Sequence, residues 1–258
     1  ISETLNIDYR TPKTLKDNHE EYEFLKELNA DLAIVCAYGQ IIPENFLNLT
    51  KKGFVNIHAS ILPSWRGAAP IQRSIMNLDP ETGISIMKIK KELDSGPVSN
   101  IYKIKIDQNQ NAQEISEKLS ALAAEKILDN VDDILEDKAK FIDQDHSKAT
   151  YAKKIDKEES RIDWDEDASK IIGKINGLFP SPGASFSFNG ERYKILKAEI
   201  GNGIGQVGEI ISNQLEVACN KNQSIKILEI QRQGKRPQKI SEFMLGSQIK
   251  KGSKLSNV

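Results

Sequence analysis

Three side chains could together move a proton beside a developing negative charge: Asn56, His58 and Asp94. Asn56 and His58 alternate with the apolar Val55 and Ile57. On a β-strand, residues i and i+2 point to the same face, so an amide and an imidazole would leave one side of the strand together. An amide can donate a hydrogen bond to an oxyanion, and an imidazole can exchange a proton near neutral pH. A carboxylate such as that of Asp94 can orient the imidazole, which predicts proton transfer beside an oxyanion.

His58 and Asp94 also have ordinary structural explanations. A single histidine on a strand, as at position 58, is usually a satisfied structural residue. Asp94 stands before Ser95-Gly96, which is a common arrangement in turns and caps. The segment that surrounds them therefore has to decide between the two interpretations.

That segment has a specific pattern. It reads Asn-x-His-x-Ser-Ile-Leu-Pro-x-x-Arg-Gly over 56–67 and is followed by Leu-Asp-Ser-Gly at 93–96. The pattern strongly resembles the 10-formyltetrahydrofolate-dependent formyltransferases. The runs Trp-Arg-Gly-Ala-Ala-Pro-Ile-Gln-Arg over 65–73 and Arg-Ile-Asp-Trp over 161–164 are similar to the branch of that family that acts on aminoacylated initiator tRNA. The resemblance extends over nearly the whole chain.

The resemblance implies a reaction and a set of site residues. The expected activity is transfer of a formyl group from 10-formyltetrahydrofolate to the free amino group of methionyl-initiator tRNA, for translation initiation. The expected catalytic residues are Asn56, His58 and Asp94, without a metal. A loop fixed by Pro63 can offer backbone groups to a flat heterocycle. The residues expected to bind the folate are Ser60, Ile61, Leu62 and Pro63 together with Ala37, Tyr38, Gly39, Gln40, Ile41 and Ile42.

Two other functions compete with this one. The first is formylation of another amine, on a purine-pathway ribonucleotide or a sugar nucleotide; Gly96-Pro97 after Asp94 resembles the purine enzymes. The run 66–73 and the second domain favour the tRNA acceptor. The other alternative is a catalytically inert RNA-binding protein, against which the presence of all three catalytic candidates argues.

The charge of the chain is unevenly distributed. Residues 180–258 hold 12 lysines and arginines against 6 acidic residues, whereas residues 111–167 hold 9 against 17. Such an asymmetry predicts an anionic partner for the basic end, and tRNA is the partner that the resemblance implies. The residues expected to contact it are Arg66, Arg73, Arg232, Lys235, Arg236 and Lys239, with a further basic group at Lys250, Lys251 and Lys254.

The catalytic candidates need a sheet to position them. The continuous apolar run 32–37 is typical of a strand that is covered on both faces. The segment 53–58 predicts the next strand, a third is expected to start at Thr82-Gly83 and to end at Asp94, and a fourth covers 98–106. Ligands of open α/β sheets bind at the carboxyl ends of the strands. We therefore expect an open, mostly parallel sheet with flanking helices.

Helical patterns occur between the strands of this first domain. They cover 20–28 and 70–76, and a long helix follows the capping-box sequence Asn111-x-x-Glu114. Domain boundaries are expected at 1–140 for the catalytic domain, 141–157 for a charged linker and 158–258 for a tRNA-binding domain. The long helix should bury one stripe, formed by Ile115, Leu119, Leu122, Ile127, Val131 and Ile134.

The second domain reads as one short helix followed by strands. The helix is expected over 168–179, before Pro180, and Asn189-Gly190 predicts a hairpin between two strands. Further strands are expected over 208–212, 215–219 and 225–230. Strands at this spacing suggest a small barrel, and the resemblance implies an OB-like one.

The remaining composition sets wider bounds. The 258 residues fit one large domain or two ordinary ones, and no apolar run approaches the ~20 residues of a membrane span. Cys36 and Cys219 match no metal spacing and are expected to be buried thiols. We expect a cytoplasmic monomer without membrane association. The family begins with a βαβ unit that is not found here, so an N-terminal part is expected ahead of Ile1.

Overall fold

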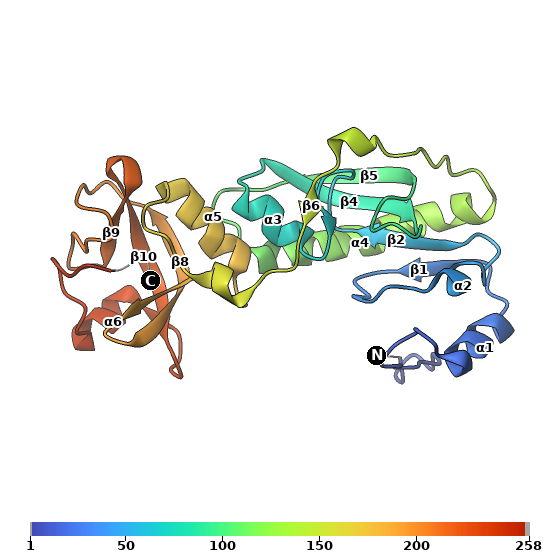
Figure 1. Cartoon of the computed structure of the whole chain (residues 1–258), viewed down its shortest axis with the longest axis horizontal. Coiled ribbons are helices and arrows are strands. Elements are labelled where there is room, and N and C mark those ends of the chain that lie inside the picture. Colours follow the sequence, from blue (N-terminus) through green and yellow to red (C-terminus); the bar gives the residue numbers. More distant parts are fainter. Residues whose placement is uncertain (1, 256–258) are drawn as a thin grey trace.

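The computed structural model describes residues 2–255, which form two parts arranged end to end (Figure 1). The first part contains a small mixed sheet and a long helix, α4. The second part contains a larger antiparallel sheet and the helix α5 (Ala168–Leu178). The helix α3 (Pro70–Met76) of the first part packs on α5 and joins the two.

The first sheet has the strand order β1-β2-β4-β5. Only β1 and β2 pair in parallel; β2 with β4 and β4 with β5 are antiparallel. The expectation of a mostly parallel sheet is therefore wrong. Parallel neighbours need a long crossover, whereas the loop 89–97 returns the chain directly beside β4. The strands are β1 (Ala33–Val35), β2 (Phe54–His58), β4 (Glu81–Lys88) and β5 (Val98–Lys105).

The strand β1 lies at the edge of this sheet. Its central residue Ile34 is 47% exposed, and Cys36 just after the strand is exposed as well. The expected coverage on both faces and the expected burial of Cys36 are therefore both wrong. The continuous apolar run marked a strand correctly but could not tell an edge strand from a central one. Around it lie the helices α1 (His19–Glu27) and α2 (Glu44–Leu47).

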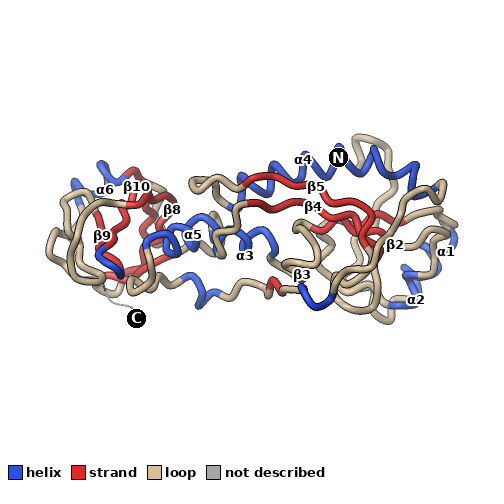
Figure 2. The backbone as a smooth tube through the Cα atoms, turned by 90° about the horizontal axis from the view of Figure 1, so that it is seen from above, coloured by secondary structure: helices blue, strands red, loops and turns tan. Residues whose placement is uncertain are grey.

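The helix α4 (Ala112–Leu135) covers one face of the first sheet. It begins at the expected capping box, in which the Asn111 side chain accepts from the Glu114 amide and the Glu114 carboxylate accepts from the Asn111 amide. Its apolar stripe packs with Val55 and Ile57 of β2. Because successive side chains alternate, Asn56 and His58 point to the opposite face. Figure 2 shows α4 along one side of the strands and the loop that carries β3 (Arg66–Gly67) on the other.

The charged segment 137–157 packs on the first domain instead of spanning a gap. Ile142 exchanges two backbone hydrogen bonds with Val98 of β5. Farther along, β6 (Tyr151–Ala152) pairs in parallel with β3. The pattern of apolar residues could not predict these contacts, because backbone pairing does not require apolar side chains. The short 3-10 helix η1 (His146–Lys148) lies between these two contacts, and η2 (Lys157–Ser160) lies between β6 and α5.

An ion pair joins α3 to the end of this segment. Nη1 and Nη2 of Arg73 donate to the Glu159 carboxylate, at 2.5 and 2.9 Å. Arg73 also donates to the backbone oxygens of Lys153 and Lys154. The Arg73 guanidinium lowers the pKa of Glu159 below its ordinary value of 4.5. The pair therefore holds the connection between the two domains against α3.

This ion pair makes stability depend on pH. A carboxylate with a lowered folded-state pKa stabilises the fold above its unfolded pKa, and that contribution is lost as the pH falls through the folded value. We expect Glu159→Gln to lower the melting temperature at pH 7, and we expect that difference to shrink as the pH falls below 4.5 and through the lowered pKa. Thermal melts from pH 3 to 7 measure it. The exposed neighbour Glu158, replaced by Gln, is the control, and an equal loss for both variants would contradict the prediction.

The second sheet runs β11-β10-β8-β7, with β9 also paired to β10. Asn189 and Gly190, at φ 50° and 78°, form the predicted hairpin turn between β7 and β8. The expected strand over 208–212 contributes only isolated bridges at Glu209 and Ile210. Within the described residues these pairings give an open sheet. The strands of this sheet are β7 (Ser185–Phe188), β8 (Glu191–Ile200), β9 (Glu216–Cys219), β10 (Gln223–Arg232) and β11 (Gln238–Lys239). The helix α6 (Ile240–Gly246) follows β11.

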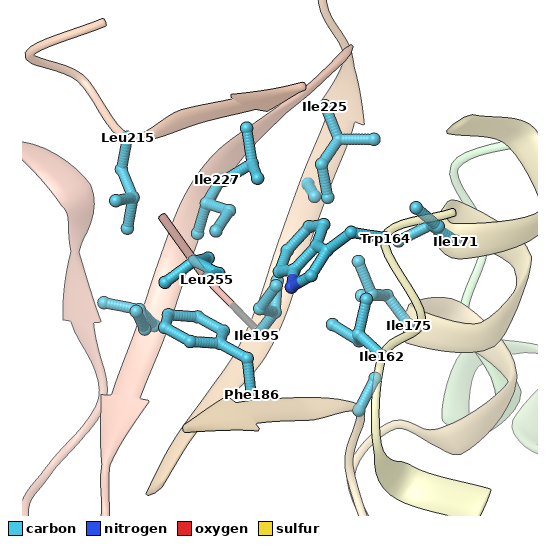
Figure 3. Close-up of a cluster of buried hydrophobic side chains, with 14 of the residues drawn as sticks. Ile162, Trp164, Ile171, Ile175, Phe186, Ile195, Leu215, Ile225, Ile227 and Leu255 are labelled. Atoms are coloured by element: carbon cyan, nitrogen blue, oxygen red, sulfur yellow. The ribbon is translucent and has the colours of Figure 1, made fainter. Parts of the chain in front are cut away.

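The larger core of the molecule lies between α5 and this sheet (Figure 3). Trp164 is fully buried at its centre, with its ring 6.0 Å from that of Phe186. Two glycines, Gly173 and Gly177, bring α5 close to α3, since a Cβ at Gly177 would lie 2.6 Å from the Met76 side chain. The second domain is thus docked closely on the helix that follows the candidate catalytic loop.

Candidate active site

The strand β2 presents the two polar candidates on the face away from α4. Asn56 lies level with Val35 of β1 and Met87 of β4, and His58 lies opposite Ser85. His58 is buried, at 6% exposure, whereas Asn56 is half-buried. Within residues 2–255 the side-chain amide group of Asn56 makes no hydrogen bond, so its N–H groups are available to a ligand.

The two nitrogens of His58 have different neighbours. Nε2 lies 2.9 Å from the backbone oxygen of Trp65. A carbonyl oxygen only accepts, so Nε2 carries the proton and donates it. Nδ1 lies 3.6 Å from Oδ2 of Asp94, which is longer than a hydrogen bond but within ion-pair distance of a protonated ring. In the neutral ring, Nδ1 is therefore the nitrogen that can accept a proton.

Asp94 reaches His58 from an unexpected direction. β4 ends at Lys88, opposite Val55, so Asp94 belongs to the loop 89–97 and not to a strand end. Because β4 is antiparallel to β2, this loop leaves the sheet at the amino end of β2 and folds back to His58. The expectation that the third strand ends at Asp94 is thus wrong. The pairing of His58 with Asp94 is nevertheless present.

The carboxylate of Asp94 is held by a backbone donor. Oδ2 accepts a 2.8 Å hydrogen bond from the Gly67 amide. Gly67 has φ 119°, and a Cβ there would lie 2.8 Å from the backbone oxygen of Ala152. Glycine is therefore required where β3 passes between Asp94 and β6.

The loop Ser60–Pro63 is anchored by a buried serine of β4. Ser85 Oγ donates to the backbone oxygen of Ser60 at 2.7 Å and accepts from the Leu62 amide at 3.1 Å. Ser60 is fully buried, and Leu62 packs against Met87 and Val98. The side chains of Ser60 and Leu62 thus support the loop, which leaves Ile61, Pro63 and backbone groups as the possible ligand contacts.

The second expected folate segment, 37–42, follows β1. Because Val35 is level with Asn56, this segment starts beside the carboxyl end of β2. Ala37 and Gly39 have φ values of 48° and 73° and turn the chain there. Tyr38 is 38% exposed and Ile41 88% exposed, so the segment presents its side chains to solvent. Both folate segments thus begin at the same edge of the sheet.

The expected tRNA contacts fall into two groups. Arg66 is 3% exposed, and its guanidinium donates to Gln144 and His146 inside the protein. The guanidinium of Arg73 is likewise paired internally, with Glu159. Burial of this kind does not fit direct contact of Arg66 with RNA. Arg232 pairs with Glu191. Of the expected tRNA contacts, Lys235, Arg236 and Lys239 are exposed without an ion pair within the described residues, in or next to the turn between β10 and β11. The further basic group at Lys250, Lys251 and Lys254 is exposed in the same way.

The site also uses residues that sequence reasoning missed. The Trp65 amide donates to Oγ1 of Thr150, and the Thr150 amide donates to the backbone oxygen of Pro63. The segment expected to be a linker therefore braces both Trp65, whose backbone oxygen bonds His58, and the loop Ser60–Pro63. A surface hollow opens beside Asp94 and is lined by Arg66, Lys90, Glu92, Ser95, His146 and Tyr151.

The described residues contain neither a metal site nor a membrane span. No group of three or more His, Cys, Asp or Glu side chains among them is placed to hold an ion. Among the helices described, even α4, with its many charged residues, is not apolar enough to cross a bilayer.

Comparisons with known proteins agree with the geometry. The formyl transferase family profile matches residues 4–131, and that of the formyl transferase C-terminal domain matches 154–248. The methionyl-tRNA formyltransferase of Pelagibacter ubique is 66% identical over all of this chain and 83% of its own length. That of Dictyoglomus turgidum is 41% identical over 95% of this chain and 81% of its own.

Solved structures show the same fold at lower identity. WlaRD, a sugar 3N-formyl transferase, superposes with a TM-score of 0.70 and 20% identity over 91% of this chain and 81% of its own. An N-formyltransferase from Helicobacter canadensis gives 0.69 and 18% over 90% and 81%. Both domain profiles match in order, and one relative is 66% identical over the entire length of this chain. This chain therefore belongs to the formyl transferase family.

Proposed function

We propose that this protein transfers the formyl group of 10-formyltetrahydrofolate to the amino group of methionyl-initiator tRNA. The observation that carries the proposal is the pairing of His58 with Asp94 beside the half-buried Asn56, on the open face of β2. The 66% identity to a methionyl-tRNA formyltransferase supports the choice of acceptor.

Formyl transfer needs one oxyanion donor and one proton acceptor. The amine attacks the formyl carbon and forms a C–N bond, which leaves negative charge on the formyl oxygen and positive charge on the new ammonium. The ammonium then loses a proton. The bond from the formyl carbon to N10 of the donor breaks as N10 takes up a proton, and tetrahydrofolate leaves. The donor is already activated, so no protein nucleophile is required.

The residues of β2 fit these two roles. The free N–H groups of Asn56 would donate to the formyl oxygen as its charge develops. The unprotonated Nδ1 of His58 would accept the ammonium proton, because Nε2–H is occupied by the Trp65 oxygen. The resulting imidazolium would face the Asp94 carboxylate, which stabilises the positive charge. His58 can then return the proton to N10.

The donor would bind where the two loops at the edge of β1 and β2 meet. The segments 37–42 and 60–63 both begin there, and the second is held rigid by Ser85. The folate would thus approach with its formyl group toward Asn56.

A non-hydrolysable folate analogue should therefore stabilise the first domain. At 100 times its Kd, the expected gain is about 2.7 kcal/mol. Hydrogen exchange of the amides of 37–42 and 60–63 should slow, while amides of β8 and β10 should not change. A fragment without the pterin ring, such as p-aminobenzoylglutamate, is the control. Protection of the second domain alone would show that the pocket is misplaced.

The second domain would orient the acceptor. Its exposed basic turn at Lys235, Arg236 and Lys239 suits an RNA backbone, and the close packing of α5 on α3 would hold that turn in a fixed relation to His58. We propose that this domain is an OB-like tRNA-binding module, and that the protein acts as a monomer in the cytoplasm.

The decisive experiment offers the purified protein several amines. Radiolabelled 10-formyltetrahydrofolate is incubated with methionyl-initiator tRNA, an amino-sugar nucleotide or a purine-pathway amine, and product formation is followed. Label should appear in the tRNA fraction alone. Transfer to the sugar nucleotide or the purine amine instead would replace the proposed acceptor, and absence of transfer to any of them would leave an RNA-binding role.

A further inference from the structure

Asp94 lies in a turn of the loop 89–97, where the amide and the hydroxyl of Ser95 both donate to the backbone oxygen of Glu92. It has φ 45°, in the left-handed region that non-glycine residues seldom adopt, and it lies outside any strand or helix. Its carboxylate must nevertheless stay within ion-pair distance of His58. Such a conformation persists only where surrounding contacts hold it.

The backbone of Asp94 is held by the side chain of Gln144. Nε2 of Gln144 donates to the backbone oxygen of Asp94 at 2.9 Å and to that of Gly96 at 2.7 Å. These two bonds clamp the loop on both sides of Ser95. Gln144 is 8% exposed and comes from the charged segment that follows α4.

The other end of the same amide is held by Arg66. Oε1 of Gln144 accepts from Nε of Arg66 at 3.0 Å and from Nη2 at 2.7 Å. An amide group has two donor hydrogens and two acceptor lone pairs, so the hydrogen-bonding capacity of Gln144 is filled. Because guanidinium groups only donate and backbone oxygens only accept, the orientation of the amide is determined by its partners.

Arg66 connects this clamp to His58. It follows Trp65, whose backbone oxygen orients His58, and precedes Gly67, whose amide binds the Asp94 carboxylate. Gln144 therefore ties the loop that carries Asp94 to the strand that positions both members of the pair.

We infer that Gln144 is a positioning residue for formyl transfer, which sets the distance between Asp94 and His58 through the Asp94 and Gly96 carbonyls. The part of this inference that concerns reaction rates rests on the proposed function. Without the clamp, the loop 89–97 would relax and the carboxylate would leave both His58 and the Gly67 amide. A misplacement of about 1 Å at a reacting group can lower the rate about 100-fold.

The isosteric variant Gln144→Glu separates this role from general folding. A carboxylate keeps both acceptors for Arg66 but has no hydrogen to donate to the Asp94 and Gly96 oxygens. The variant should therefore fold, and its kcat should fall about 10- to 100-fold, with little change in KM for either substrate. Asn176→Asp is the matched control, because Asn176 is equally buried and donates to the backbone oxygen of Gln108 away from Asp94.

A double-variant cycle tests whether the effect passes through Asp94. In an Asp94→Ala background, Gln144→Glu should lower kcat less than twofold, because the carboxylate that it positions is already absent. An equal loss in both backgrounds, or a parent-like kcat for Gln144→Glu, would overturn the inference.

Amide exchange provides a readout that needs no activity. The Gly67 amide is protected by the Asp94 carboxylate, so its hydrogen exchange, followed by NMR, should speed up at least about tenfold in Gln144→Glu and stay unchanged in Asn176→Asp. Unchanged exchange of Gly67 in Gln144→Glu would overturn the inference even if the parent proved inactive. Inactivity of the parent toward methionyl-tRNA would instead refute the proposed function alone.

Discussion

Replacing Asn56 with alanine is expected to lower kcat for formyl transfer by about 100- to 1,000-fold, the usual effect of removing one oxyanion donor. The fold should remain intact, because the side chain of Asn56 is half-buried and its amide group makes no hydrogen bond within residues 2–255. The hydrogen-bond donor that this substitution removes is used only when charge develops on the formyl oxygen. KM for both substrates should therefore change little, and steady-state kinetics on methionyl-tRNA measures the difference.

Variants of the neighbouring residues complete this test. Asp94→Ala should also reduce turnover by orders of magnitude, since the protonated His58 would lose its counter-charge. Asn100→Ala is the matched control: it removes a half-buried asparagine of β5 that lies opposite Ile86, on the face covered by α4. Near-normal turnover of Asn56→Ala or Asp94→Ala would refute the assignment of these residues.

The double substitution Lys235→Ala/Arg236→Ala is expected to raise KM for tRNA about tenfold, taking roughly 0.7 kcal/mol for each exposed charge. Both residues are exposed in the turn between β10 and β11, and neither forms an ion pair within the described residues. They can therefore contact phosphates without breaking an internal contact. Because the turn lies in the second domain and not at His58, kcat should stay close to that of the parent.

Salt dependence distinguishes phosphate contacts from general effects of charge. Each lost phosphate contact should reduce the slope of log affinity against log salt by about 1, so that the double variant loses about 2. Lys13→Ala/Lys16→Ala is the control, with the same number of charges removed from exposed positions near the N-terminus. If the control raised KM as much as the test variant, or if tRNA affinity were insensitive to salt, the second domain would not be the electrostatic guide.

Local patterns in the sequence determined much of the fold. Alternation over 54–58 placed Asn56 and His58 on one face, and the Asn111 capping box marked the start of α4. The dipeptide Asn189-Gly190 marked the hairpin between β7 and β8. These features depend on residues a few positions apart, where backbone geometry translates spacing directly into direction. The formyltransferase pattern over 56–67 was likewise local, and it identified the family.

Contacts between distant segments were decided only by the tertiary structure. The antiparallel order β2-β4-β5 sends Asp94 out at the far end of β2, and a folded-back loop returns it to His58. Arg66, expected on the surface, is buried because Gln144 supplies an acceptor from beyond α4. A charged segment without apolar periodicity gives no sign that its backbone and amide groups will be used in pairing. Such hydrogen bonds depend on which segments meet in space, and the spacing of residues along the chain does not contain that information.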